Sequence, residues 1–171
     1  KIVVHQLGVN LAGFVGFERS VITAGGIATG EIVAKTLEEI GIAELKDKPY
    51  TEISGGERQQ ATIARAIVAE PQAILFDEPT AHLDYGNQLK TLRLIKSLKE
   101  KGYAIIITTH NPDHAIMLGG TTAILARDGC LTVGKTGEII TEDTLQKLYD
   151  ADLSLVELDE VNRPICVPPD L

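Results

Sequence analysis

The sequence predicts an α/β fold, in which buried strands alternate with amphipathic helices. The first observation is the short, unbroken apolar run Ala73–Phe76, which ends in two acids and a proline and is typical of a buried parallel strand. The second is the β-branched, apolar run 103–108, which predicts another buried strand. The third is the helical spacing, between these runs, of Leu89, Leu92, Ile95 and Leu98. A length of 171 residues fits one domain, and 44% hydrophobic residues suffice for a core.

One strand and one helix are predicted before residue 54. Ile2-Val3-Val4 predicts a strand that ends near Gln6. A helix is predicted from Glu31 to Ile40, with Gly41 as its stop. The apolar face expected for this helix consists of Ile32, Val33, Thr36, Leu37 and Ile40.

Ser54 begins the most informative helix. Ser54 and Glu57 form a capping box, and the helix is expected to run to about Ala69 on the periodic positions Ala61, Ala64, Ile67 and Val68. Gly55 and Gly56 leave the backbone N–H groups of its first turn uncovered. Such an N-terminus, with a serine hydroxyl beside it, suits an anionic phosphate. An ordinary capped helix is the alternative if Ser54 and Glu57 are considered alone.

Three polar residues follow the two predicted strands. Asp77 and Glu78 would lie at the C-terminal edge of the sheet, where open α/β sheets bind ligands. Asp77 suits Mg²⁺, directly or through water, and Glu78 suits the polarisation of an attacking water. His110, just past the 103–108 strand, could hydrogen-bond a γ-phosphate at the same edge. The alternative for Asp77-Glu78 is an acid pair that merely ends a strand.

The remaining elements follow from caps, stops and turns. They are a helix from about Tyr85 to Lys101 capped by Asp84, a short helix from Asn111-Pro112 to Gly119-Gly120, a hairpin of 122–127 and 131–133 around Asp128-Gly129, a last helix from Thr141 to about Asp150, and two edge strands within 153–167 around Asn162-Arg163-Pro164.

Composition excludes several classes of function. A net charge of −8 argues against a general nucleic-acid binder, which normally has a basic face. Cys130 and Cys166 are far apart, form no paired-cysteine motif and indicate incidental thiols in a reducing compartment. No apolar run approaches the length that spans a bilayer, so a membrane role would come through a partner.

Four segments together resemble one family. Ile53–Gln60 resembles the signature motif of ATP-binding-cassette (ABC) ATPases, Ile74–Thr80 their Walker B strand, Ala81–Asp84 their D-loop, and Ile107–His110 the strand that ends in the switch histidine. The resemblance implies a partial P-loop NTPase (RecA-like) core with a helical subdomain. The chain is most similar to the ATPase subunits that drive import of iron–siderophore, haem or cobalamin. Importers of zinc or manganese are the competing assignment.

The resemblance also implies a division of the chain. Its four parts would be the end of a core strand with the Q-loop at 1–6, a helical subdomain with the signature helix at 7–70, the RecA-like core at 71–151 and C-terminal tail strands at 152–171.

The family's chemistry implies roles for the motif residues. Ser54, Gly55, Gly56 and Glu57 would bind ATP held by a second subunit in a head-to-tail dimer. Asp77 and Gln6 would serve Mg²⁺. Catalysis would rest on Glu78, His110, Gln6 and Asp84, with Asp84 linking the two sites. The partners implied are transmembrane permease subunits, which would hold the ATPase at the cytoplasmic face of the cell membrane.

The five residues that precede Gln6 in this sequence do not include the Gly-x-x-x-x-Gly-Lys-Ser/Thr phosphate loop, which the family carries well upstream of its Q-loop. The segment Gly129–Thr136 matches that pattern, but Leu131 and Val133 alternate like a strand and Gly137–Ile140 is a poor first helical turn. We therefore expect a decoy, and a fragment that does not hydrolyse ATP alone. The alternatives are a non-catalytic interaction module, or a rearranged nucleotide-binding protein that uses Lys135 and Thr136.

Overall fold

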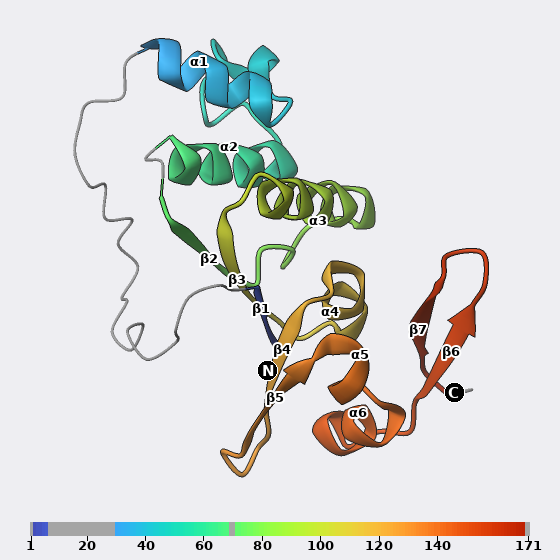
Figure 1. Cartoon of the computed structure of the whole chain (residues 1–171). Coiled ribbons are helices and arrows are strands. Elements are labelled where there is room, and N and C mark those ends of the chain that lie inside the picture. The colour runs from blue at the N-terminus through green and yellow to red at the C-terminus, as the bar shows by residue number, and fades with distance from the viewer. Residues whose placement is uncertain (1, 7–29, 69–70, 170–171) are drawn as a thin grey trace. The chain divides into compact units, whose positions relative to one another are not determined.

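The computed structural model describes residues 2–6, 30–68 and 71–169, and these contain helices and strands in the alternation that the sequence predicts (Figure 1). The strands are β1 (Ile2–Gln6), β2 (Ala73–Asp77), β3 (Ala104–Thr109), β4 (Thr121–Leu125), β5 (Leu131–Lys135), β6 (Ser154–Leu158) and β7 (Arg163–Val167). The α-helices are α1 (Gly30–Glu39), α2 (Gly55–Ile67), α3 (Tyr85–Glu100), α4 (Pro112–Leu118), α5 (Thr136–Ile139) and α6 (Glu142–Tyr149), and a 3₁₀ turn, η2, covers Ala43–Leu45.

The chain divides into two compact units. The described part of the first is residues 2–6, 75–79 and 105–169, and that of the second is residues 30–68, 71–74 and 80–104. Helix α3 belongs to the second unit, whereas the resemblance grouped it with the core at 71–151. The proposed domain boundaries stay a prediction.

The first unit is built on a five-stranded sheet with the order β2-β3-β1-β4-β5. Where β2 and β3 begin, the Ala104 amide donates a hydrogen bond to the Gln72 carbonyl oxygen. Where the two strands end, the Glu78 amide donates to the Thr108 carbonyl oxygen. These two strands are therefore parallel, as predicted. Strand β1 is antiparallel to both of its neighbours, β3 and β4, and β5 is antiparallel to β4.

The sheet of the first unit buries one face. Burial alternates along β3, where Ile105 and Ile107 are buried, and helices α4 and α5 pack over the buried side (Figure 1). On the other face, large apolar side chains are exposed: Leu75 by 54%, Leu125 by 44%, Leu131 by 55% and Val133 by 58%. The sequence predicts that β2 is a buried strand; Ile74 and Phe76 are buried, whereas Leu75 on the other face is exposed.

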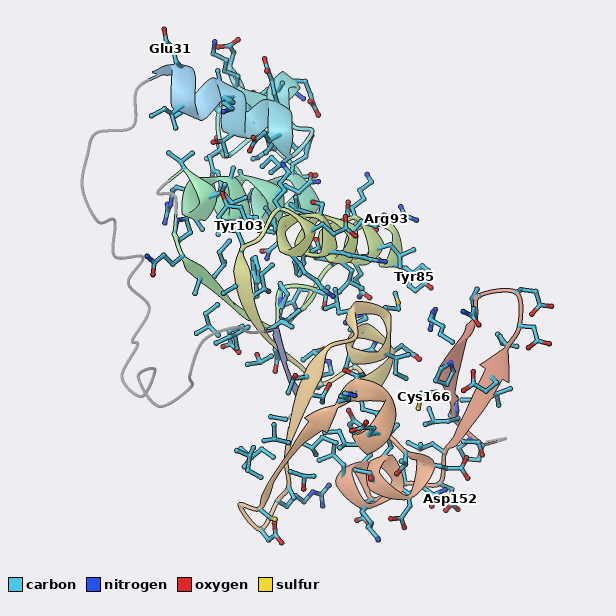
Figure 2. All side chains as sticks on the ribbon, in the orientation of Figure 1. Glu31, Tyr85, Arg93, Tyr103, Asp152 and Cys166 are labelled. Carbon is cyan, nitrogen blue, oxygen red and sulfur yellow. The ribbon has the colours of Figure 1, made fainter. Side chains whose placement is uncertain are left out.

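Strands β6 and β7 pair only with each other in the described chain, from Ser154↔Val167 to Leu158↔Arg163. The prediction of two strands was correct, but they form a separate two-stranded sheet instead of edges of the larger one. Cys166, labelled in Figure 2, lies on β7. Its amide donates to Asp113 Oδ1 on α4 at 3.0 Å, and this bond joins the small sheet to the rest of the unit.

The second unit is a helical layer in which α2 lies between α1 and α3 (Figure 1). Its core includes Ile40, Ile42, Ile63, Ile67, Leu92, Ile95 and Leu98. On the apolar face predicted for α1, Thr36 and Ile40 are buried, whereas Ile32 and Val33 are 40% and 37% exposed. Within the second unit, α1 thus buries its C-terminal half more than its first turn.

Candidate functional site

Asp77 and Glu78 lie where β2 ends, in the first unit. The Thr108 hydroxyl donates to Asp77 Oδ1 at 2.5 Å and accepts from the Glu78 amide at 3.1 Å. Glu78 has a φ of 46°. That left-handed conformation costs a non-glycine residue about 1–2 kcal/mol and is typical of functional sites. Thr108 therefore bonds both acids, and the backbone strain lies at Glu78.

His110 reaches the same edge from the neighbouring strand. It follows β3 directly, and its Nδ1 lies 3.4 Å from Glu78 Oε2. The His110 side chain is 71% exposed and that of Glu78 34% exposed, so both are accessible to a ligand. The structure thus brings Asp77, Glu78 and His110 together, as the sequence predicts.

The edge suits a hydrated cation better than a closed metal cage. Among the residues that the structure describes, no three His, Cys, Asp or Glu side chains converge to hold a metal ion. Mg²⁺ is usually bound by one or two carboxylates and completes its shell with water and phosphate oxygens. The exposed carboxylate of Asp77 fits that role.

Gln6 lies at the other edge of the sheet. Because β1 is antiparallel to β3, Gln6 is opposite Ile105 at the start of β3, and Ile2 is opposite Thr109 at its end. The expectation that Gln6 joins Asp77 at the metal position is therefore not met in this arrangement. The physical reason is strand direction: a residue after a strand shares an edge with its neighbours only where the strands are parallel.

Ser54 caps α2 as predicted, in the second unit. The Glu57 amide donates to Ser54 Oγ at 3.2 Å, and the Ser54 amide donates to Glu57 Oε2 at 2.7 Å, which completes the capping box. The bonds from Ser54 hold the pKa of Glu57 below its usual value. Glu57 therefore keeps a negative charge beside the helix N-terminus.

Gly55 and Gly56 occupy the first turn of α2. In the described part of the chain their amides have no hydrogen-bond partner, so the two N–H groups can donate to an anion. Gly56 is buried, and a Cβ placed there would lie 2.5 Å from Cγ and Oδ1 of Asn87. The close approach of Asn87 explains why glycine suits this position.

Asp84 caps α3 through hydrogen bonds from Asn87. Its Oδ1 accepts from the Asn87 amide at 2.9 Å and its Oδ2 from Asn87 Nδ2 at 2.6 Å. These bonds hold the pKa of Asp84 below its usual range. Asn87 thus connects the predicted D-loop aspartate with the first turn of the signature helix within the second unit.

The segment Gly129–Thr136 does not form a phosphate loop. Residues Leu131–Lys135 are extended and paired with β4. A one-turn helix does start at Thr136, contrary to expectation, but the strand runs into it without a loop of amides. The Thr136 hydroxyl is buried, 2.9 Å from Thr122 Oγ1 and 3.0 Å from the Gly120 carbonyl oxygen to which it donates. The geometry agrees with a decoy.

Sequence reasoning missed Thr108, Asn87 and Tyr149. Thr108 had a signal, because it is a polar residue in an apolar strand, two positions before His110. Asn87 had one signal, its position three residues after the predicted helix cap Asp84. Tyr149, whose hydroxyl donates to the His110 carbonyl oxygen at 2.6 Å, lies 39 residues away and had no local signal.

None of the helices in the described ranges is long and apolar enough to cross a bilayer. Both cysteines are free thiols, Cys130 exposed and Cys166 half-buried. Burial raises the pKa of the Cys166 thiol, with a further contribution from Asp113, so this thiol stays protonated at neutral pH.

Comparison with known proteins agrees with the motif assignment. Residues 4–81 match the family described as ABC transporter. An uncharacterized ABC transporter ATP-binding protein of Haemophilus influenzae is 38% identical over 119 residues, which are 70% of this chain and 45% of that protein. The iron(3+)-hydroxamate import ATP-binding protein FhuC of Bacillus subtilis is 34% identical over 82% of this chain and 52% of its own length.

A solved structure shows the same fold. It is described as an inward-facing conformation of a metal-chelate type ABC transporter, and it matches with a TM-score of 0.75 and 29% identity over 82% of this chain and 57% of that chain. The chain spans about half the length of the curated relatives that it matches.

Proposed function

Since this chain belongs to the ABC transporter family, we propose that it is part of an ATP-hydrolysing subunit that energises import of a metal chelate such as an iron–siderophore, haem or cobalamin. The importer class is supported by the FhuC relative and by the metal-chelate type transporter with the same fold. The activity belongs to the longer protein of which this chain matches about half.

The observation that carries the proposal is the arrangement of Glu78. Its amide is held by the Thr108 hydroxyl and carbonyl oxygen, and its carboxylate lies 3.4 Å from the His110 ring. Glu78 would accept a proton from the water that attacks the γ-phosphorus, while the bond to the bridging oxygen of ADP breaks. His110 would donate a hydrogen bond to the γ-phosphate oxygens as their charge redistributes.

The cofactors of this reaction are ATP and Mg²⁺. Asp77 would hold the metal ion, which supplies neutralisation of the phosphate charge when bound. The amides of Gly55 and Gly56, which lack a partner among the residues that the structure describes, would with Ser54 bind the γ-phosphate of ATP held by a second subunit in a head-to-tail dimer. Asp84 would link the two sites of that dimer. The proposed further partners are permease subunits, which would place the ATPase at the cytoplasmic face of the membrane.

The experiment is ATP turnover by the full-length subunit with Glu78→Gln. We expect turnover to be nearly abolished while ATP still binds, because the amide keeps the shape of the side chain but cannot accept the proton. Glu100→Gln, at the exposed end of α3, is the matched control and should retain normal turnover. Normal turnover in Glu78→Gln would refute the proposed mechanism.

A further inference from the structure

The position of His110 is set by its backbone and not by its ring. The side chain is 71% exposed, so packing of the imidazole restrains it little. Its ring nitrogen is nevertheless 3.4 Å from Glu78, at the edge where β2 and β3 end. Something other than side-chain burial must therefore keep the residue at this edge.

Tyr149 supplies a restraint from the far end of the chain. Its hydroxyl, at the end of α6, donates to the His110 carbonyl oxygen at 2.6 Å. The next residue is held as well, because the Asn111 amide donates to Thr109 Oγ1 at 3.0 Å. The peptide that follows the histidine is thus fixed at both of its polar atoms.

Tyr149 is itself well held. Leu145, one helical turn earlier and on the same face of α6, is fully buried, and Tyr149 is half-buried. Helix α6 starts at the Thr141 cap and stops at Asp150 in the left-handed conformation. Burial raises the pKa of Tyr149 to about 12, so its hydroxyl remains a hydrogen-bond donor at any pH near neutral.

We propose that Tyr149 is a positioning residue for His110: by donating to the His110 carbonyl oxygen, it holds the imidazole at the edge that carries Asp77 and Glu78. The inference rests on the proposed function, because the histidine is expected to act on the γ-phosphate. A misplacement of about 1 Å in a reacting group can cost on the order of a hundredfold in rate. Through this bond, helix α6 would influence the rate of the reaction without contacting the substrate.

The test is Tyr149→Phe in the full-length ATPase, which removes the hydroxyl and keeps the ring that packs in the unit. Loss of a transition-state interaction alone lowers kcat and leaves KM unchanged. We expect kcat to fall at least tenfold at an unchanged KM for ATP. Tyr50→Phe removes a hydroxyl from a side chain that is 58% exposed in the second unit, and it should change neither constant.

A second readout separates this proposal from the proposed function. In NMR spectra of the chain itself, Tyr149→Phe should shift the His110 ring and Asn111 amide resonances, and Tyr50→Phe should not. If the wild-type protein does not hydrolyse ATP, the proposed function fails and the spectra still test the positioning. A kcat within twofold of wild type in an active enzyme, or unshifted His110 resonances, would overturn the role of Tyr149.

Discussion

Gly56 offers the sharpest test of how the signature helix is packed. A Cβ at this position would lie 2.5 Å from Cγ and Oδ1 and 2.8 Å from Nδ2 of Asn87. Carbon atoms in ordinary contact are about 3.5–4.0 Å apart, so Gly56→Ala creates an overlap of about 1 Å. Gly55, its neighbour in the same helical turn, has nothing within 4 Å of the equivalent Cβ. The two glycines therefore form a matched pair for substitution.

The expected loss of stability follows from comparing the surroundings of Gly55 and Gly56. Neither glycine has a left-handed φ, so both substitutions gain the same few tenths to about 1 kcal/mol from reduced backbone freedom. Only Gly56→Ala adds overpacking, which typically costs about 1–3 kcal/mol. Asn87 can escape the added methyl group by rotating its side chain, but that breaks its bond to Asp84 Oδ2.

The assay is urea unfolding of the two single variants, of Asn87→Ala and of the double variant. We expect Gly56→Ala to be about 1–3 kcal/mol less stable than Gly55→Ala, which corresponds to about 3 °C in Tm per kcal/mol. Asn87→Ala removes all three atoms that the new Cβ would meet, so Gly56→Ala should cost nothing in that background. Equal costs of Gly56→Ala in both backgrounds would refute the packing argument.

Two further predictions concern the first unit. Thr136→Val should lower the free energy of unfolding by about 1–3 kcal/mol, because the fully buried Thr122 hydroxyl loses its hydrogen bond to Thr136. Lys135→Ala changes a side chain that is 81% exposed. It should change the free energy of unfolding by no more than about 0.5 kcal/mol and leave nucleotide binding unchanged. Urea unfolding measures the two stability changes, and a Mg-ATP titration measures nucleotide binding. Weakened ATP binding by Lys135→Ala would contradict the decoy assignment. Burial holds the pKa of His114 below 6.5 despite the opposing charge of Asp113, with a smaller lowering from His110. The unfolded chain then binds more protons, so stability should fall as pH drops through 6.5 towards the folded pKa, and His114→Gln should flatten that slope between pH 7 and 5.5. An unchanged slope would show that His114 is not the group responsible.

Local chemistry accounts for what the sequence predicts well. The caps at Ser54, Asp84, Asn111 and Thr141 all form, because each bond closes within three residues of the cap. The hairpin around Asp128-Gly129 also forms, with Gly129 at a φ of 86°. Asp77, Glu78 and His110 meet because two parallel strands end at one edge, and parallel order followed from the helix between them.

The features that escaped prediction depend on long-range partners. The direction of β1 is set by its neighbours in the sheet, and nothing in Ile2–Gln6 specifies it. Ile32 and Val33 have the right spacing for a buried face, but exposure depends on what packs against α1. The contact of Tyr149 with His110 joins residues 39 positions apart. Periodicity and capping rules use only neighbouring residues, so they predict neither which distant segment a residue contacts nor how that segment is oriented.

The place of β1 in the sheet also constrains the order of folding. The β4–β5 hairpin closes across residues 126–130, whereas Ile2 pairs with Thr109 and Ile124 across more than a hundred residues. On loop length alone, closing the longer segment costs about 3 kcal/mol more conformational entropy. When the unfolded chain refolds, the local contacts of the hairpin can therefore form before β1 pairs with β3 and β4. In refolding from denaturant, we therefore expect β1 to take its place between β3 and β4 after the β4–β5 hairpin has formed.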